Sequence, residues 1–153
     1  MNPTDIVARD GTRAKLQSQF PPPYVPGMDA AGVVDQVGEG VSTGIKVGDR
    51  VMAVVVAKAS HGAYREQLVL NQHAVVPAPA NTTHLQASTL PMNALTARLS
   101  LDLLELSPGQ VLAVTGGPGA YGGYVIELAK AAGLTGIADA AQSDRALLQT
   151  LGA

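Results

Sequence analysis

The chain of 153 residues has no cysteine and no tryptophan, one phenylalanine, and only 14% charged residues. The absence of cysteine excludes disulfide bonds and thiolate metal ligands. No apolar run reaches the roughly 18 residues that a membrane-spanning helix needs, and the polar start, MNPTDIVARDG, lacks the apolar stretch of a signal peptide. Because the sequence shows neither a membrane-spanning segment nor a signal peptide, we expect a cytoplasmic protein that spans no membrane.

Positive charge is scarce as well. Ten Lys and Arg residues stand against twelve Asp and Glu residues, and they form no basic block. Nucleic-acid binding normally requires a basic stripe, so we expect no nucleic-acid partner. Aliphatic residues are abundant instead: hydrophobic residues make up 46% of the chain and aromatic residues 3%. The composition predicts a globular protein with a core of Val, Leu, Ile and Ala.

The first half of the chain alternates turn signals with short apolar runs. Residues 1–28 contain the run Pro21-Pro22-Pro23, followed by Pro26-Gly27, and predict an extended loop. Apolar runs at 31–34 and 51–56 are separated by glycine-containing turns, and the segments GAYREQLVL and HAVVPAP extend the pattern. Many short strands with glycine turns are typical of a small β-barrel.

The pattern changes after Pro79. Between residues 86 and 106, leucines recur at helical spacing and predict a helix: Leu95, Leu99, Leu103 and Leu106. Residues 111–114 are typical of a buried parallel strand. A glycine-rich loop, an apolar helix, a weaker strand at 137–138 and a last helix follow; the expected buried side of that last helix is Leu147, Leu148 and Leu151. This order predicts the start of a doubly wound α/β sheet.

The loop after the strand, VTGGPGAYGG, has five glycines among its ten residues. It contains Gly117-x-Gly119-x-x-Gly122, and Asp139 ends the next strand, 20 residues beyond Gly119 (139 − 119). In a dinucleotide-binding turn the first glycine permits the tight turn and the second lets backbone N–H groups approach a pyrophosphate. The third lets the helix pack close to the strand, and the helix N-terminus faces the anion. The alternative is a glycine-rich turn without a ligand.

Several segments, in their order along the chain, carry a resemblance to a known family: VPGMDAAGVVDQVGEGV, VGDRV, LPMNALTARLSLDLLELSPGQ, and the glycine loop followed by ELAKAAG. They resemble the medium-chain dehydrogenase/reductase superfamily, most closely its zinc-independent quinone oxidoreductase branch. The resemblance implies an α/β architecture with a GroES-like β-barrel portion at residues 1–84 and the first half of a Rossmann doubly wound parallel sheet at residues 85–153. It also implies a chain that starts late and stops early relative to the family, whose full-length form is expected to be a homodimer.

The same resemblance implies a cofactor site. Asn2, in NPTD, is similar to the asparagine near the nicotinamide, and Thr96, in NALTA, to the threonine near the nicotinamide ribose and phosphate. Arg145 falls where a Lys or Arg of this branch reaches the adenosine 2′-phosphate. The backbone segment that holds the pyrophosphate is matched by Gly119, Ala120 and Tyr121, where the family more often has glycine and valine at the last two positions. The expected cofactor-binding set is completed by Gly117, Gly122 and Asp139.

The resemblance also bears on zinc. The zinc-containing branch has Gly-His-Glu where this chain has Gly27-Met28-Asp29, and it uses cysteine ligands. A catalytic zinc needs three converging ligands, whereas His61, His73 and His84 lie far apart without H-x-x-x-H spacing. We therefore expect no metal site.

Two residues give opposite indications of which cofactor is bound. Asp139 favours NAD(H), because a carboxylate accepts a hydrogen bond from the ribose 2′-hydroxyl and repels a 2′-phosphate. Arg145 and the resemblance favour NADP(H), which we expect, with NAD(H) as the alternative. The expected reaction is zinc-independent hydride transfer from NADPH to a quinone or an α,β-unsaturated carbonyl compound.

Two other functions remain open at this point: a truncated, non-catalytic nucleotide-binding module, and a zinc-independent alcohol dehydrogenase-like enzyme. No catalytic residue is assigned. Tyr64 is the one candidate proton donor, with the alternative that it is a core residue of a barrel strand.

Overall fold

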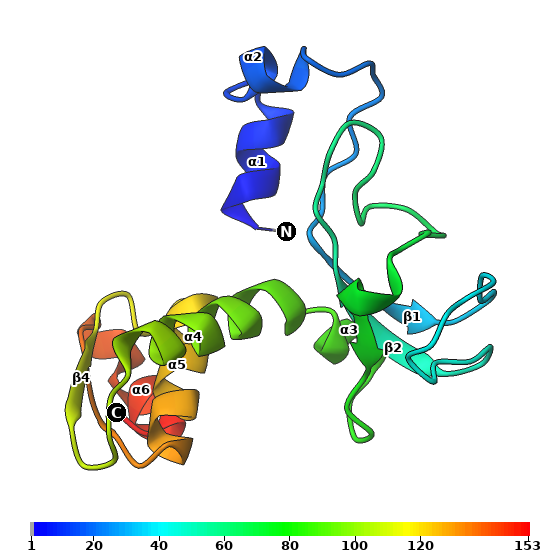
Figure 1. The fold of residues 1–153 in the computed structure, drawn as a ribbon. Helices are drawn as coiled ribbons and strands as arrows, with labels where there is room; N and C mark the ends of the chain where they lie inside the picture. Colours follow the sequence, from blue (N-terminus) through cyan, green and yellow to red (C-terminus); the bar gives the residue numbers. More distant parts are fainter. Residues whose placement is uncertain (1) are drawn as a thin grey trace. The chain divides into compact units, whose positions relative to one another are not determined.

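The computed structural model describes residues 2–153, which form two compact units (Figure 1). The first unit ends at Pro91 and the second runs from Met92 to Ala153. The first contains short helices and an antiparallel sheet, and the second contains helices packed on a parallel pair of strands. The family-domain boundary expected after residue 84 stays a prediction.

Two short helices begin the first unit: α1 (Pro3–Arg9) and α2 (Ala14–Gln17). The expectation of an extended loop is therefore wrong for this segment. Asn2 caps α1, because its side chain accepts a hydrogen bond from the Thr4 N–H at 3.2 Å. The Asp5 side chain accepts from the Asn2 N–H at 2.8 Å. Asn, Pro and Asp at the N-cap, N1 and N3 positions form a capping box, which is a local signal for a helix start.

The sheet of the first unit has three antiparallel strands in the order β1-β2-β3: β1 (Asp29–Val33), β2 (Arg50–Val54) and β3 (Val75–Pro77). Met52 of β2 lies opposite Ala31 on one side and Val76 on the other. A 3-10 turn, η1 (Gln72–Ala74), leads into β3. The strands expected at the two apolar runs and in HAVVPAP are thus confirmed.

The GAYREQLVL segment is not a strand. It crosses the chain near residues 25–28 instead, where the N–H groups of Ala63 and Tyr64 donate to backbone carbonyls at 2.9 and 3.1 Å. Gly62 is buried at this crossing, and a Cβ there would lie 1.9 Å from the Val25 carbonyl oxygen. The direct approach of two backbones takes the place of the expected strand pairing.

The helix expected over residues 86–106 is two helices. The first, α3 (His84–Ala87), packs on β1 and has Thr83 as its N-cap. The second, α4 (Pro91–Leu104), begins at a proline. Proline has no N–H to donate and disfavours the helical conformation of the residue before it, so a helix ends or begins there.

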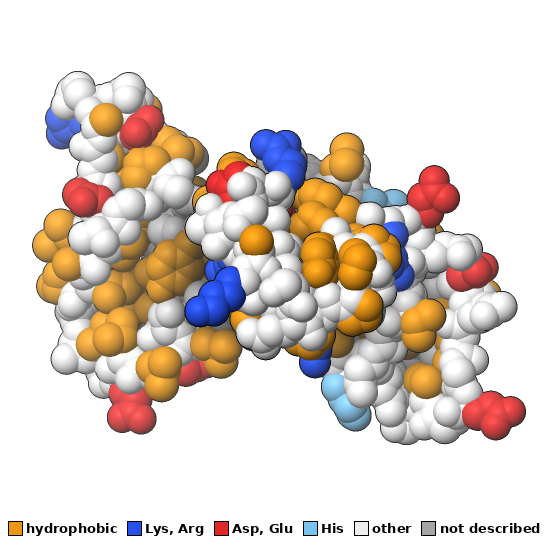
Figure 2. Space-filling view, turned by 90° about the horizontal axis from the view of Figure 1, so that it is seen from above, with side chains coloured by type: hydrophobic (Ala, Val, Ile, Leu, Met, Phe, Trp, Pro, Cys, Tyr) orange, Lys and Arg blue, Asp and Glu red, His pale blue; other side chains and the backbone are white. Residues whose placement is uncertain are grey.

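The buried face of α4 is not its leucine stripe. Ala97 and Leu101 are buried, at 0% and 6% exposure, whereas Leu95, Leu99 and Leu103 are 46%, 53% and 85% exposed. Figure 2 shows hydrophobic side chains of this kind, in orange, at the surface. Helical spacing identified the helix, but the small side chain of Ala97 is what allows close packing.

The second unit continues with two parallel strands, β4 (Val111–Val114) and β5 (Thr135–Ala138), in which Val111 lies opposite Thr135 and Val114 opposite Ala138. Helix α5 (Ala120–Ala131) connects them. A 3-10 turn, η2 (Gln142–Asp144), and α6 (Arg145–Leu151) follow β5. This order confirms the expected start of a doubly wound sheet.

One aliphatic cluster forms the core of the second unit. Ile126 and Ala129 of α5 are almost completely buried, and Leu148 of α6 packs with them. Leu147, which was expected on the buried side of the last helix, is 46% exposed. The buried members of the cluster are Ala97, Leu101, Val114, Val125, Ile126, Ala129 and Leu148.

Candidate dinucleotide-binding site

The glycine turn starts where β4 ends. Gly116 has a φ of +68°, a left-handed conformation that glycine adopts without steric cost. The tight turn expected at Gly117 lies one residue earlier, because Gly116 is the left-handed residue and Gly117 is not. The Gly116 N–H donates to Asp139 Oδ1 at 2.6 Å, and the Gly116 carbonyl accepts from the Gly119 N–H at 3.0 Å.

Gly117 and Gly122 are required by close packing. A Cβ on Gly117 would lie 2.9 Å from the Ala138 Cβ and 3.0 Å from a methyl group of Leu148. A Cβ on Gly122 would lie 2.4 Å from the Gly116 carbonyl oxygen. The third glycine therefore lets α5 pack against the turn that leaves the strand.

Gly119 has a different environment. It is the N-cap of α5, with φ −70° and ψ 160° and no side-chain cap. A Cβ there would meet the Gly116 carbonyl oxygen at 3.2 Å and, apart from its chain neighbours, no other described atom within 4 Å. The first N–H groups of a helix have no partner within the helix and carry partial positive charge. The backbone at Gly119 is therefore open to a close approach, which a phosphate bound at a helix N-terminus requires.

Asp139 follows β5 and turns toward the loop. Its Oδ1 accepts the hydrogen bond from Gly116, and its own N–H donates to the Val114 carbonyl at 3.2 Å. One carboxylate oxygen is thus engaged by the protein rather than left free for a ribose hydroxyl. An open hollow of about 380 Å³ lies beside these residues at the carboxyl ends of the strands; it is lined by Gly116, Pro118, Asp139, Ala140 and Ala141.

Arg145 is the first residue of α6 and is exposed. Among residues 2–153 it forms no salt bridge, whereas Arg98 does so with Asp102 on α4. A cation in the first turn of a helix is slightly unfavourable toward the helix dipole. The contact with the adenosine 2′-phosphate expected for Arg145 stays a prediction.

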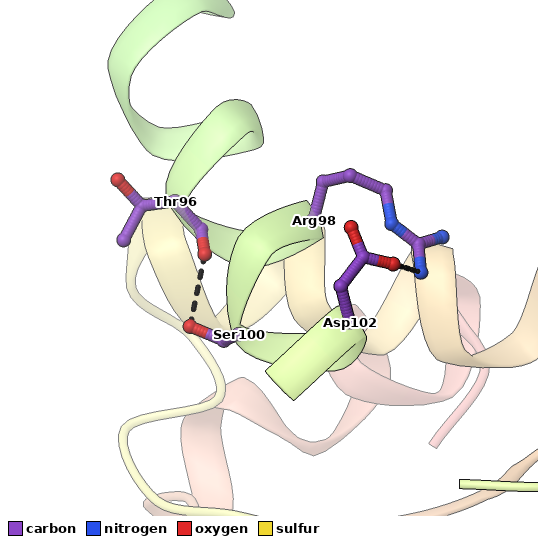
Figure 3. Close-up of polar contacts among 4 residues, drawn as sticks. All are labelled: Thr96, Arg98, Ser100 and Asp102. Atoms are coloured by element: carbon purple, nitrogen blue, oxygen red, sulfur yellow. Dashed lines mark hydrogen bonds and ion pairs between the residues drawn. The ribbon is translucent and has the colours of Figure 1, made fainter. Parts of the chain in front are cut away.

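Thr96 lies on α4 with its hydroxyl donating to the Met92 carbonyl at 2.6 Å. Ser100, one turn further, donates to the Thr96 carbonyl at 2.9 Å (Figure 3). The Tyr121 hydroxyl donates to Ser100 Oγ at 2.8 Å, which links α4 to the first turn of α5. The cofactor roles expected for Thr96 and Tyr121 stay predictions, and nothing in the sequence singles out Ser100 as their hydrogen-bonding partner.

Asn2 lies in the first unit, next to a polar cluster centred on Asp5. Asp5 is only 7% exposed and accepts three hydrogen bonds: from the Asn2 N–H at 2.8 Å, the Gly27 N–H at 2.9 Å and the Tyr64 hydroxyl at 3.2 Å. The cluster borders a cavity of about 180 Å³ whose walls include Phe20 and Met28. The role expected for Asn2 at the nicotinamide stays a prediction.

The surroundings of Tyr64 do not favour the release of its proton. Burial raises the pKa of its hydroxyl above the ordinary value, and the negative charge of Asp5 and the hydrogen bond to Asp5 act in the same direction. A raised pKa means that the hydroxyl holds its proton more tightly. A phenolate formed beside the Asp5 carboxylate would also be repelled by it. The side chain is 49% exposed, so it is not a core residue either.

Within residues 2–153, no three His, Cys, Asp or Glu side chains gather closely enough to hold a metal ion. Asp29, which occupies the last position of the Gly27-Met28-Asp29 triplet, is the first residue of β1.

Comparison with known proteins identifies the family. Residues 1–80 match the alcohol dehydrogenase GroES-like domain. The chain belongs to this family. The resemblance to the medium-chain dehydrogenase/reductase superfamily and the expected α/β fold are thereby confirmed.

Relatives of this GroES-like family extend the match over the whole chain. An Arabidopsis thaliana protein named NADPH-dependent alkenal/one oxidoreductase, chloroplastic, is 36% identical over 160 residues, covering 100% of this chain and 41% of the relative. A solved alcohol dehydrogenase superfamily protein from Novosphingobium aromaticivorans has a TM-score of 0.90 at 33% identity, covering 100% of this chain and 46% of that one. The quinone oxidoreductase of Coxiella burnetii has a TM-score of 0.87 at 31% identity, with coverage of 100% and 48%.

The chain therefore spans less than half the length of each of these relatives. No helix within residues 2–153 is long and apolar enough to cross a lipid bilayer. The cytoplasmic location and the homodimer expected from the sequence stay predictions.

Proposed function

We propose that this chain carries the NADP(H)-binding turn of an oxidoreductase that transfers a hydride to a quinone or an α,β-unsaturated carbonyl compound without zinc. The observation that carries the proposal is the start of α5. Its N-cap is a glycine in open space, and close packing requires glycine both in the preceding turn, at Gly117, and in the first turn of the helix, at Gly122. Two relatives support the reaction class, since one is named an NADPH-dependent alkenal/one oxidoreductase and the other a quinone oxidoreductase.

The chain's own residues hold the cofactor in this proposal. The N–H groups at the start of α5 bind the pyrophosphate, and Arg145 pairs with the 2′-phosphate. Thr96 lies near the nicotinamide ribose, and Asn2 near the nicotinamide. NADPH, when bound, supplies the hydride, and the protein supplies orientation and a site that excludes water.

The engagement of Asp139 supports NADP(H) over NAD(H). Its carboxylate accepts a short hydrogen bond from the Gly116 N–H, so part of its acceptor capacity and charge is directed at the loop. This weakens the argument that Asp139 acts as the ribose acceptor. NAD(H) remains the alternative, with Asp139 then accepting from the 2′-hydroxyl through its other oxygen.

The absence of zinc is part of the proposal. Met28 stands between Gly27 and Asp29 where the zinc-containing branch has a histidine, and a thioether is a poor ligand for this ion. Without a Lewis acid, an acceptor activated by conjugation is a better substrate than a simple alcohol or ketone. Stoichiometric zinc in the purified protein would contradict this part of the proposal.

The test of the phosphate site is Gly119→Val. A branched Cβ fills the space in front of the helix N-terminus, so NADPH binding, followed by the fluorescence of the reduced nicotinamide, should be lost. The far-ultraviolet circular dichroism spectrum should stay unchanged, because the added Cβ meets only the Gly116 carbonyl oxygen, at 3.2 Å, apart from its chain neighbours. Unchanged affinity in a folded variant would contradict the proposed site. Oxidation of NADPH by quinones and enones then tests turnover, and binding without turnover would favour a nucleotide-binding module.

Arg145→Ala tests the choice of cofactor. A charge-assisted contact typically raises affinity roughly tenfold to hundredfold. Its loss should therefore lower the affinity for NADPH by that factor and leave the affinity for NADH unchanged. Asp139→Asn is the matched variant, because an amide oxygen can still accept from Gly116 while the negative charge is gone. Asp139→Asn should increase the affinity for NADPH. If wild type prefers NADH and Arg145→Ala leaves the ratio unchanged, NADP(H) is the wrong cofactor.

A further inference from the structure

The Tyr121 side chain connects the glycine turn to a second helix. Tyr121 is the second residue of α5, and its hydroxyl donates to Ser100 Oγ on α4 at 2.8 Å. Ser100 Oγ in turn donates to the Thr96 carbonyl oxygen at 2.9 Å, the bond drawn in Figure 3. Two hydrogen bonds in series therefore run from the first turn of α5 to Thr96, and each donor strengthens the next.

Besides the hydrogen bond from the Gly116 N–H to Asp139, the start of α5 has few polar constraints on its exposed side. Gly119 offers no side-chain cap, and the neighbouring Ala120 is exposed and has only a methyl group. Glycine-rich segments lose more conformational entropy on ordering than other sequences. A side chain that reaches out of the turn to a neighbouring helix reduces this loss, because it restricts the turn before a ligand binds.

The same link acts on Thr96. The Thr96 hydroxyl is anchored to the Met92 carbonyl at 2.6 Å, and its carbonyl accepts from Ser100. Met92, Thr96 and Ser100 are four residues apart and so share one face of α4. Arg98 and Asp102 form their own ion pair, separate from this series of hydrogen bonds. Tyr121 is therefore bonded to the face of α4 that carries Thr96.

We propose that Tyr121 and Ser100 are positioning residues of the dinucleotide site. Their hydrogen bond fixes the first turn of α5 relative to Thr96, so that the N–H groups for the pyrophosphate and the threonine for the adjoining ribose keep one geometry. This inference rests on the proposed function, since it assumes that a dinucleotide binds at the turn.

The test compares two ligands that use different parts of the site. NADPH carries a pyrophosphate, whereas adenosine 2′-monophosphate does not and depends on the adenosine end alone. Tyr121→Phe removes one hydroxyl and should weaken NADPH roughly two- to tenfold, the range for one neutral hydrogen bond. The affinity for adenosine 2′-monophosphate, measured by displacement or calorimetry, should stay unchanged.

Ser100→Ala removes the other side of the same bond and should reproduce the effect of Tyr121→Phe. The double variant should bind NADPH no more weakly than the worse single variant, because both substitutions remove one interaction. The matched control is Tyr24→Phe in the first unit, which also loses one hydroxyl hydrogen bond, to the Phe20 carbonyl at 2.9 Å. It should leave NADPH affinity unchanged.

Three results would overturn the inference. If wild type binds NADPH and Tyr121→Phe binds it equally well, the bond does not position the site, and the proposed function stands. If Tyr121→Phe weakens both ligands by the same factor, the bond has only a structural role. If wild type binds no NADPH, the proposed function fails and this inference fails with it.

Discussion

The two units are stabilised by different kinds of contact. In the second unit, aliphatic side chains from α4, β4, α5 and α6 form one cluster that includes Ile126 and Leu148. In the first, the buried hydrophobic residues are small: Ala53, Val55 and Ala87. Its distant segments are joined by hydrogen bonds to the Asp5 carboxylate and by the close approach of two backbones beside Gly62.

This difference predicts two responses to mutation. A packed aliphatic cluster relaxes only partly around a missing group, so its loss of stability grows with the volume of the cavity that remains. A backbone crossing or a buried carboxylate has no such tolerance, because one added atom or one lost acceptor leaves groups that cannot be paired again. The first unit should therefore be the more sensitive to small changes.

The largest effect is expected at the backbone crossing. Gly62→Ala places a Cβ 1.9 Å from the Val25 carbonyl oxygen, so the crossing must open and the free energy of unfolding should fall by about 3 kcal/mol or more. Urea unfolding followed by circular dichroism measures this. The control is Gly38→Ala, since apart from the chain neighbours no described atom lies within 4 Å of a Cβ there. Equal stability of the two variants would contradict the crossing as described.

A smaller effect is expected in the aliphatic cluster. Leu148→Ala leaves a cavity next to α5 and should lower the free energy of unfolding by about 2–4 kcal/mol. Leu147→Ala, the adjacent residue on the same helix, is 46% exposed and should change it by less than about 1 kcal/mol. Similar losses in both variants would show that α6 is not docked through Leu148.

The smallest effect is expected at Tyr64 and depends on pH. Its pKa is raised in the folded state, so its contribution to stability is complete below the unfolded pKa of about 10 and is lost as the pH rises through the folded value. Wild type should therefore lose more stability than Tyr64→Phe between about pH 9 and 11. Unfolding midpoints at the two pH values measure this, and parallel losses in both proteins would contradict it.

Local patterns explain most of what the sequence predicted. The strand, turn and helix around Gly117 and Gly122 follow one another within a short segment, so periodicity and glycine spacing were enough to predict them. The pairing of β5 with β4 and the position of Asp139 followed from the same motif. The α1 helix was not predicted, although Asn2, Pro3 and Asp5 form a local capping box. The proline run favoured an extended loop for the whole of residues 1–28.

Contacts between distant residues were not predictable. The bond from Gly116 to Asp139 spans 23 residues, and the bond from Tyr121 to Ser100 spans 21; both depend on side-chain rotamers that no spacing rule specifies. The irregular course of GAYREQLVL is set by its contact with residues 25–28 rather than by its own apolar alternation. The buried face of α4 depends in the same way on which side chain fits the core.

The three glycines of the turn have separate consequences for how such a sequence can evolve. Gly117 and Gly122 touch Leu148 and the Gly116 carbonyl so closely that the fold needs them whether or not a nucleotide binds. A descendant that lost its ligand would keep these two and could replace Gly119 with a small residue at little cost in stability. A glycine at position 119 therefore indicates ligand binding, whereas glycines at the outer two positions indicate only the fold.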